Sequence, residues 1–479
     1  MGKSIGKPEP VPPGKINEPQ SGSLLQAQWR RGKLYHNLSE DGITAEYEIH
    51  YQIGAGKVGH SYAVLAKDFL LESPASYYRR YGWDVSPGYA GSELLDFNRV
   101  LTARCLFCHS NPPNFFQEKR LTANDLIAIS CERCHGETAE HVRRPSSANI
   151  VNPAKLPVRA RDSICEQCHL EGVARVLNPG KSLSDFRPGK NLEDTMVTYV
   201  ARQPGSDVTA VSQEEQLALS RCAIESRGKL WCGTCHNPHR PLTDAKAEIK
   251  AVCESCHTTV SAPDHANKSE CVSCHMPRRS PSDVTHAAIT DHRIRAKPEQ
   301  PPPLTPALPQ TITAWREPRP DLQQRDLGLA YMRASQNPHF RGFGEAGATL
   351  LKGLPLSQQN ADPEAMAAQG DAALSQGHTA DALSFFRRAR ELDPSSAEYA
   401  LYLGIALERN ADLAGARSEL QQAIQLDRSL QRAYLELSAI DVKQGRVSDA
   451  ASVLDQYLQF DPQSILIRLT RETLIPGKK

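Results

Sequence analysis

Hydrophobic and polar residues alternate along the N-terminal part of the chain. The alternation starts at Leu34 and continues through residues 43–53, which read ITAEYEIHYQI. A period of two is typical of β-strands with one buried face. Gly54 and Gly56 follow, and they predict a tight turn or a close approach of the backbone before the next apolar run. We therefore predict a small β-rich region over residues 34–91.

Beyond residue 320 the pattern becomes helical and repeats every 34 residues. Ala382, Ala416 and Ala450 are 34 residues apart, and aspartates near the ends of the units keep the same spacing. This period is typical of tetratricopeptide repeats, in which small residues let paired helices approach closely. Three repeats are predicted, over residues 363–396, 397–430 and 431–464.

Further helices are expected on both sides of these repeats. A looser helical pair is predicted over residues 321–357, and the sequence ILIRLTRETL at 465–474 would cap the stack, because a terminal repeat must cover its apolar face. Residues 321–479 are thus expected to form an all-α solenoid. Its concave groove would dock a redox partner protein, and the alternative is a scaffold that only packs against the rest of the chain.

Two segments are expected to lack regular structure. Residues 298–320 hold eight prolines and predict a stiff, extended linker. Residues 1–22 are rich in Pro, Gly, Lys and Ser, and we expect them to be disordered. Between these segments, residues 23–297 would form one domain, in which short helical runs and loops follow the β-rich region. The fold class is therefore multidomain.

Composition narrows the classes of partner. The 479 residues suffice for two or three domains, although only 39% are hydrophobic and 6% aromatic. The mean hydropathy is −0.48. Because 56 basic and 55 acidic residues leave a net charge of +1, neither nucleic acid nor an anionic membrane is implied as a partner. No stretch approaches the roughly 18 apolar residues of a transmembrane segment.

The candidate chemistry lies in one pentapeptide, Cys-x-x-Cys-His, which occurs six times between residues 105 and 275. This is the pattern by which c-type haem is attached. Thiols three residues apart on a helical turn are neighbours, so both reach one porphyrin, and the next histidine can bind the iron. The thiols are those of Cys105, Cys108, Cys131, Cys134, Cys165, Cys168, Cys232, Cys235, Cys253, Cys256, Cys271 and Cys274. The proximal histidines are His109, His135, His169, His236, His257 and His275. We therefore predict six covalent haems c, whose porphyrins would supply apolar core.

Paired thiols also occur in structural zinc sites, where two pairs provide four ligands. Zinc, however, places no demand on the next residue, and an iron–sulfur cluster needs thiolates without a following histidine. Since histidine follows all six pairs, the sequence favours haem over both alternatives.

A low-spin haem takes a second axial ligand, which in multihaem proteins is most often another histidine. Sixteen histidines are present, and ten of them lie outside the motifs. The six distal candidates are His141, His286, His292, His239, His36 and His60. Each of them could instead be a surface or core histidine with a satisfied hydrogen bond. His50 and His265 rank lower, and His339 and His378 are expected to be structural.

One cysteine lies outside the six motifs. Cys222 stands ten residues before Cys232 and has no second unpaired thiol with which to form a disulfide. We expect it to act as a small buried hydrophobic residue. A thiolate ligand is the alternative.

Several stretches carry a resemblance to a known family. In order along the chain they are CLFCHSN, CERCHGETAEHV, IVNPAKL, CEQCHLEGVARVLNPG, DFRPGKNLED, CGTCHNPH, and CVSCHMPRR with DHRI. They resemble the multihaem c-type cytochromes of the cytochrome c-554 class, and more closely the large bacterial branch that is fused to tetratricopeptide repeats. GAGKVGHSY and WDVSPGY are similar to the stretch that precedes the haem region in that branch. The resemblance implies bis-histidine haems and electron transfer in the periplasm or at the outer cell surface.

Two expectations concern the N-terminus. Covalent haem attachment of this type takes place outside the cytoplasmic membrane, yet residues 1–15 have no apolar segment of a signal peptide. We therefore expect a periplasmic or extracellular protein whose export signal is not part of this sequence. Relatives carry a further Cys-x-x-Cys-His upstream, so the resemblance also implies a seventh haem there.

Two classes of function follow from these observations. The first is an electron-transfer protein, in which haems packed edge to edge conduct electrons. The second is an oxidoreductase for small nitrogen or sulfur compounds, which needs one iron with an open position. Because enough histidines are present to fill every site and no Cys-x-x-Cys-Lys occurs, the sequence favours electron transfer.

Overall fold

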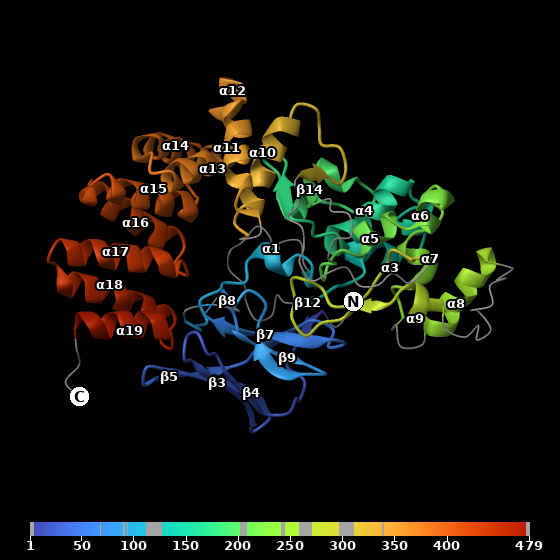
Figure 1. The fold of residues 1–479 in the computed structure, drawn as a ribbon, viewed down its shortest axis with the longest axis horizontal. Helices are drawn as coiled ribbons and strands as arrows, with labels where there is room; N and C mark the ends of the chain where they lie inside the picture. The colour runs from blue at the N-terminus through green and yellow to red at the C-terminus, as the bar shows by residue number, and fades with distance from the viewer. Residues whose placement is uncertain are drawn as a thin grey trace. The chain divides into compact units, whose positions relative to one another are not determined.

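The computed structural model describes residues 4–67, 69–89, 92, 94–111, 127–201, 208–240, 245–257, 271–296, 311–337 and 340–475. The chain divides into two compact units (Figure 1). Among the described residues, the first unit comprises Ser4, residues 107–111 and residues 127–317. It therefore contains the Cys-x-x-Cys-His motifs except for Cys105 and Leu106 of the first motif. The second comprises residues 5–106 and 318–475. Each unit is described separately below.

The N-terminal part of the second unit consists of two antiparallel sheets. One has four strands in the order β2 (Gly14–Asn17), β3 (Leu24–Arg30), β4 (Lys33–Glu40) and β5 (Ile43–Glu48). The other has the order β1 (Ile5–Gly6), β6 (Tyr51–Ile53), β7 (Gly59–Ala66), β9 (Ala75–Tyr78) and β10 (Gly82–Val85), with β8 (Phe69–Glu72) beside β7. Alternate residues of β5, namely Ile43, Ala45 and Tyr47, point into the core, as the period of two predicted.

The predicted β-rich region is confirmed, but its boundaries were wrong. Residues 1–22 were expected to be disordered, whereas β1 and β2 within them pair with β6 and β3. Short strands flanked by proline escape a periodicity argument, because they offer too few positions for one. The predicted strand over 43–53 is interrupted after Glu48, so His50 lies between two strands. Gly54 and Gly56 form the predicted turn, with φ of 102° and 71°.

The C-terminal part of the second unit is a stack of paired helices. The predicted repeats begin at the first residues of three helices, and each repeat contains one helical pair. The pairs are α13 (Pro363–Ser375) with α14 (Thr379–Leu392), α15 (Ala397–Arg409) with α16 (Leu413–Leu426), and α17 (Gln431–Lys443) with α18 (Val447–Phe460). Before them lie α10 (Gln323–Ala334), α11 (Phe343–Lys352) and α12 (Leu356–Gln359), and after them α19 (Ile465–Leu474). The flanking pair and the terminal helix were both predicted.

Small residues allow these helices to pack as the repeat pattern implied. Ala382, Ala416 and Ala450 are completely buried. A Cβ atom on Gly370 would lie 2.7 Å from the ring of Phe386, so only glycine fits there. Gly377 turns the chain between α13 and α14 with φ of 80°, in the left-handed region that favours glycine.

Within the second unit, the β-sheets hold the last helix of the stack. The carboxylate of Asp96 accepts hydrogen bonds from the Ser464 hydroxyl (2.8 Å) and from the backbone N–H groups of Ile465 (3.3 Å) and Leu466 (3.1 Å). Asp96 thus caps the N-terminus of α19 from another part of the chain. The Ile465 side chain is buried in the core of the β-sheets. The β-rich region was predicted to belong with the haem motifs, and this contact places it with the repeats instead.

A second buried carboxylate strengthens this junction. Asp461 accepts a hydrogen bond of 2.9 Å from the Tyr47 hydroxyl and is almost completely buried. Burial, together with the nearby Asp96 charge, raises the pKa of Asp461 to about 7.

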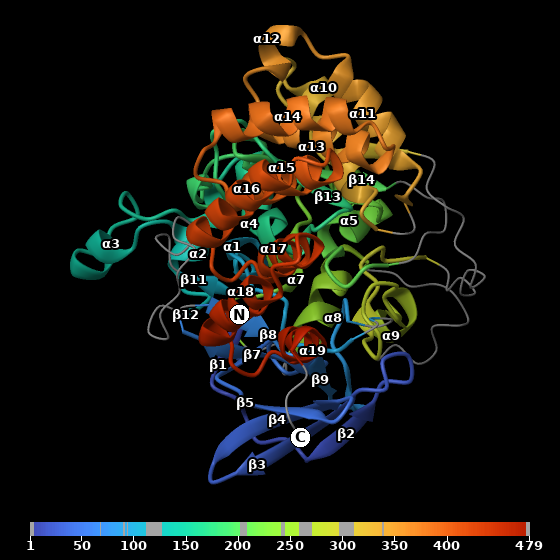
Figure 2. The ribbon, with the colours of Figure 1, turned by 90° about the vertical axis from the view of Figure 1, so that its left-hand side faces the viewer.

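The first unit is built of short helices joined by loops and small sheets. Its helices are α2 (Glu132–His135), α3 (Ala139–Arg143), α4 (Val158–His169), α5 (Gln213–Ala218), α6 (Arg221–Ser226), α7 (Cys232–Cys235), α8 (Ala245–Cys256) and α9 (Cys271–His275). Two-stranded sheets join β11 (Ser110–Asn111) to β12 (Ile127–Ala128) and β15 (Arg278–Arg279) to β16 (Ile289–Thr290). Figure 2 shows α3 projecting away from the other helices of this unit.

A three-stranded sheet in this unit was not predicted. It has the order β13 (Ala174–Leu177), β14 (Met196–Ala201) and β17 (Ile312–Ala314). The predicted linker over 298–320 is therefore wrong from residue 312 onward, because β17 pairs with β14 through Ala201, Val200 and Tyr199. Residues 298–310 lie outside the described part of the chain. Among the described residues, no helix is both long and apolar enough to cross a membrane.

Candidate haem-attachment sites

The six motifs lie on helical turns, as their spacing predicted. In the second motif the N–H of His135 donates to the carbonyl of Cys131 (2.9 Å), and His236 and His257 make the corresponding bonds to Cys232 and Cys253 (2.9 Å each). These turns place both cysteines of a motif on one side, with the histidine beside them. All twelve motif cysteines are free thiols, and none is fully buried. They are therefore accessible for attachment to a porphyrin.

The cysteines of successive motifs are neighbours in space. The thiol of Cys168 in the third motif interacts with that of Cys108 in the first, and the thiol of Cys165 in the same motif interacts with that of Cys232 in the fourth. The thiol of Cys134 in the second motif is also close enough to that of Cys165 for their charges to interact. The third motif thus adjoins the first, second and fourth.

The remaining motifs continue the series. Cys253 of the fifth motif lies within electrostatic range of Cys235 in the fourth, and Cys271 of the sixth lies within the same range of Cys253. Cys222, on α6, is partly buried and interacts with Cys235 and Cys253. The expectation that it is a buried hydrophobic residue is thus met only in part. Contacts between thiols therefore link the first three motifs to the fourth, the fourth to the fifth, and the fifth to the sixth.

Hydrogen bonds orient several histidine rings. In His135, Nδ1 lies 2.7 Å from the carbonyl of Val151, and in His275 it lies 2.6 Å from that of Arg295. Nδ1 of His292 is 2.8 Å from the carbonyl of Thr290. Metal-binding histidines characteristically donate one ring N–H to such a carbonyl, which fixes the ring and directs the other nitrogen to the metal. Nε2 is then the nitrogen available to an iron.

Two pairs of histidines have the separation of axial ligands. The rings of His135 and His239 have centroids 5.8 Å apart and planes inclined by 21°, and those of His236 and His292 are 6.1 Å apart and inclined by 33°. An imidazole nitrogen lies about 2 Å from its metal and roughly 1 Å from its own ring centre, so two imidazoles on opposite sides of one iron have centroids about 6 Å apart. Both pairs match this distance.

The electrostatics of the first unit also suit metal ligands. Burial lowers the pKa of His109, His169 and His292, so these imidazoles are neutral near pH 7. A neutral imidazole is the form that binds a metal. Among the described residues, no group of three or more His, Cys, Asp or Glu side chains is arranged to hold a metal ion.

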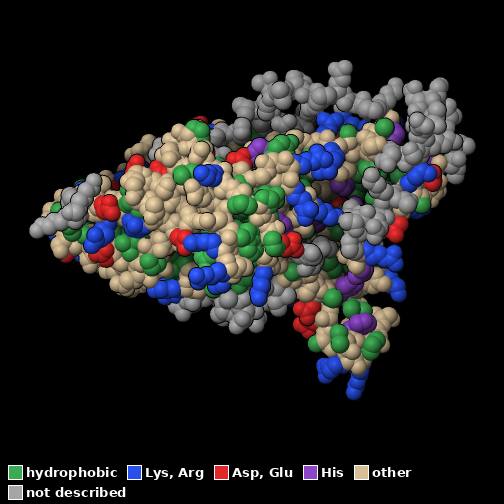
Figure 3. Space-filling view, turned by 90° about the horizontal axis from the view of Figure 1, so that it is seen from below, with side chains coloured by type: hydrophobic (Ala, Val, Ile, Leu, Met, Phe, Trp, Pro, Cys, Tyr) green, Lys and Arg blue, Asp and Glu red, His purple; other side chains and the backbone are tan. Residues whose placement is uncertain are grey.

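The structure places the six distal candidates in different surroundings. It brings His239 and His292 to proximal histidines, as described above. His141, on α3, has Nδ1 3.0 Å from Asn149 Oδ1, and His286 adopts a left-handed backbone with φ of 57°. The assignment of these two histidines as ligands stays a prediction. On the face shown in Figure 3 several histidines reach the surface near Lys and Arg side chains.

His36 and His60 lie in the β-sheets of the second unit. His36 is completely buried, with Nδ1 2.7 Å from the Ser73 hydroxyl and its ring packed edge-on against Tyr62 and Trp83. Burial lowers its pKa to about 3. Because the proximal histidines belong to the first unit, the assignment of His36 and His60 as haem ligands stays a prediction. His265 and His339 lie outside the described residues, and His378 directly precedes α14 in the repeats.

Sequence reasoning missed the charged residues that surround the motifs. Arg175, on β13, donates to the carbonyl of Gln167 (3.1 Å) and lies beside Cys108 and Cys168. Glu214, on α5, accepts a hydrogen bond of 3.2 Å from the Cys232 thiol. Arg175 follows the third motif by six residues and Glu214 precedes the fourth by eighteen, but a single Arg or Glu among 56 basic and 55 acidic residues carries no recognisable pattern.

Comparisons with known proteins bear most clearly on the helical stack. A family model described as "Tetratricopeptide repeat" matches residues 367–430. The C-terminal helices form a tetratricopeptide-repeat solenoid. Similar solved structures include the tetratricopeptide-repeat domain of Arabidopsis OM64, which is 22% identical, with a TM-score of 0.23 over 24% of this chain and 96% of that one. MamA is 20% identical, with a TM-score of 0.27 over 30% of this chain and 81% of that one.

One curated protein is similar to part of the chain. The multiheme cytochrome MtrA of Shewanella baltica (strain OS185) is 24% identical over an alignment of 201 residues that covers 35% of this chain and 56% of MtrA. The chain therefore spans about half the length of this relative. The match gives weak support to a multihaem cytochrome.

Proposed function

We propose that the chain is a multihaem c-type cytochrome that carries electrons along haems attached at its six Cys-x-x-Cys-His motifs. The observation that supports this proposal is that two proximal histidines each have a second histidine ring close by, with ring centroids 5.8 Å apart for His135 with His239 and 6.1 Å apart for His236 with His292. Haem c, when bound, supplies an iron that accepts and releases one electron.

The residues of the chain have distinct parts in this function. The cysteines fasten each porphyrin by two thioether bonds, and the proximal histidines hold the irons from one side. His239 and His292 would be the second protein ligands of the irons held by His135 and His236, and as ligands they would exclude small molecules from those irons. The contacts between successive motifs arrange the attachment points in a continuous series. Such a series suits conduction, because electron transfer requires closely spaced centres.

The solenoid and the location of the protein complete the proposal. Tetratricopeptide repeats generally mediate protein–protein contacts, and one similar solved structure is the first repeat domain of Spaghetti (RPAP3) bound to an HSP90 peptide. We propose that the repeats of this chain dock a redox partner protein. We also place the protein outside the cytoplasmic membrane, in the periplasm or at the cell surface, because covalent attachment of haem c belongs there.

Substitution of His292 by alanine tests the ligand pairing. Loss of this imidazole is expected to leave the haem of His236 without its second protein ligand, so that one ferric haem changes from low spin to high spin. Electron paramagnetic resonance of the oxidised protein measures this change. His378→Ala is the matched control, because His378 lies in the repeats, and we expect its spectrum to be unchanged. An entirely low-spin spectrum for His292→Ala would contradict the pairing, and a high-spin signal already present in the wild type would favour an oxidoreductase.

A further inference from the structure

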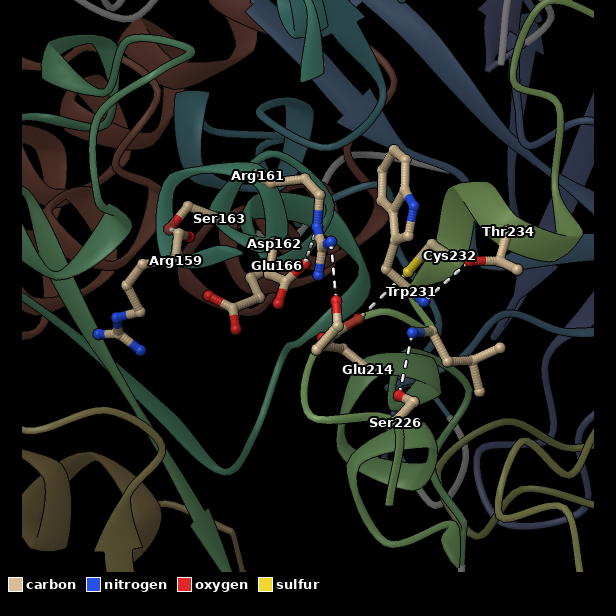
Figure 4. A network of polar contacts seen from close by, with 12 residues as sticks. Arg159, Arg161, Asp162, Ser163, Glu166, Glu214, Ser226, Trp231, Cys232 and Thr234 are labelled. Carbon is tan, nitrogen blue, oxygen red and sulfur yellow. Dashed lines mark hydrogen bonds and ion pairs between the residues drawn. The ribbon is translucent and has the colours of Figure 1, made fainter. Parts of the chain in front are cut away.

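A buried carboxyl lies between the third and fourth motifs. Glu214 is 8% exposed, and its Oε2 accepts a hydrogen bond of 3.2 Å from the Cys232 thiol of the fourth motif. The Cys232 thiol also interacts with the Cys165 thiol of the third motif. Figure 4 shows the Glu214 side chain directed toward Cys232, beside Trp231, with the polar side chains of α4 on its other side.

The charges around Glu214 come from each element packed against it. Asp162 and Glu166 on α4 face it, and so does Arg316, which follows β17. Arg316 is committed to Glu166, to which its Nη2 donates at 2.9 Å. Asp162 accepts a hydrogen bond of 2.8 Å from Nε of Arg161, whose guanidinium lies over the Trp231 ring. On α6 the charged side chains of Arg221 and Glu225 are mostly exposed.

Two cations near Glu214 in the described part of the chain are engaged with other carboxylates, Arg316 with Glu166 and Arg161 with Asp162. The pKa of Glu214 is raised to about 7, mainly by burial and also by the charges of Glu166 and Asp162, although the Cys232 hydrogen bond and Arg316 act in the opposite direction. A carboxyl in this state changes its proton occupancy when a nearby charge changes by one unit. The geometry therefore provides a proton-binding group beside two attachment points.

Haem attachment would change the interactions that set the protonation of Glu214. Each thioether bond replaces the S–H hydrogen of a cysteine, so Cys232 would no longer donate to Glu214. Loss of this hydrogen bond raises the pKa of Glu214, whereas the positive charge of a ferric iron at the third or fourth site would lower it. The iron charges of the third and fourth sites would become its main variable electrostatic neighbours.

We propose that Glu214 binds a proton when the haem of the third or fourth motif is reduced, and releases it on reoxidation. The inference rests on the proposed function. The ferric iron accepts one electron from a redox protein, and the Glu214 carboxylate accepts one proton from water, so the local charge is unchanged. Reoxidation returns the electron to the next haem and the proton to solvent. Electron flow through the middle of the chain would thus be coupled to pH.

Spectroelectrochemical titration of the haem-loaded full chain tests this inference. In the wild type, the midpoint potentials of one or two haems are expected to decrease as the pH increases through neutrality. The decrease should be up to about 59 mV for each tenfold decrease in proton concentration. Glu214→Gln removes the proton-binding group at nearly constant volume, so we expect this slope to disappear and the potentials to become nearly constant. Glu225→Gln, an exposed change on α6, should retain the wild-type slope.

Infrared difference spectroscopy provides a second readout. Reduction of the wild type near pH 7 should produce the C=O band of a protonated carboxyl, and this band should be missing in Glu214→Gln. An unchanged slope in Glu214→Gln, or a wild type whose potentials do not vary with pH, would overturn the inference while leaving the proposed function intact. A protein that carries no haem after export would instead overturn the proposed function itself.

Discussion

Replacing Cys165 and Cys168 by serine is expected to divide the series of haems into separate parts. The third motif adjoins the first, second and fourth, since its cysteines lie beside Cys108, Cys134 and Cys232. Without its two thiols the third haem cannot be attached. The haem count should fall by one, and electrons entering at the first two haems should no longer reach the fourth, fifth and sixth at the wild-type rate. Stopped-flow reduction, followed at the haem absorption bands, would show a large slow phase.

The sixth motif provides the matched control. Cys271→Ser with Cys274→Ser also removes one haem, but this motif adjoins only the fifth in the described contacts. The remaining haems should stay connected, so reduction should retain the wild-type rate with a smaller amplitude. Equal kinetics in the two double variants would contradict the order of haems inferred from the thiol contacts.

Removing the carboxylate of Asp96 is expected to release α19 from the β-sheets. Asp96→Ala leaves the Ser464 hydroxyl and the N–H groups of Ile465 and Leu466 without their acceptor in a completely buried place. Each unsatisfied buried donor costs about 1 to 3 kcal/mol, so we expect a loss of about 3 to 5 kcal/mol in the local stability of the junction. Hydrogen exchange of the α19 amides measures this loss directly, because it reports local opening.

Asp455→Ala tests whether any acidic residue near α19 has the same effect. Asp455 pairs with Arg471 of α19, but both side chains are close to half exposed. An exposed ion pair contributes only about 0 to 1 kcal/mol, so exchange in α19 should change little. If the two variants accelerated exchange equally, the Asp96 cap would not be the interaction that holds the helix.

The helical half of the fold was predictable because its information is local and repeated. Because the 34-residue period occurs in three successive repeats, each repeat boundary is supported by the other two. The first residues of α13, α15 and α17 coincide with the predicted starts of the repeats. The β-strands were predictable where alternation lasted for several residues, as in β4 and β5. β1, β2 and β17 were missed because two to four residues show no period.

Contacts between distant parts of the chain could not be predicted. Asp96 and Ser464 are separated by 368 residues, and nothing in either local sequence points to the other. The β-rich region was assigned to the domain that follows it in sequence, although it packs with the repeats. Adjacency along the chain is a sound default for assigning domains, and it fails when one unit is inserted between two parts of another.

The residues of the candidate site likewise fall into those that the local sequence predicted and those that only the fold identifies. Its cysteines and proximal histidines follow from a spaced motif, and His239 and His292 were found because they lie close in sequence to a motif. Their pairing depends on the fold, since His135 and His239 are far apart along the chain. Glu214 has no local pattern at all, and only its burial and its contact with Cys232 distinguish it from other acidic residues.

The mass of the exported full-length protein, measured after denaturation, tests the central claim most directly. The account predicts a red protein whose mass exceeds that of its 479-residue polypeptide by six haems for the motifs within this sequence. Because thioether bonds are covalent, this excess must survive denaturation and acid extraction. A colourless chain with the mass of the polypeptide alone, or one that releases zinc instead of retaining haem, would contradict it.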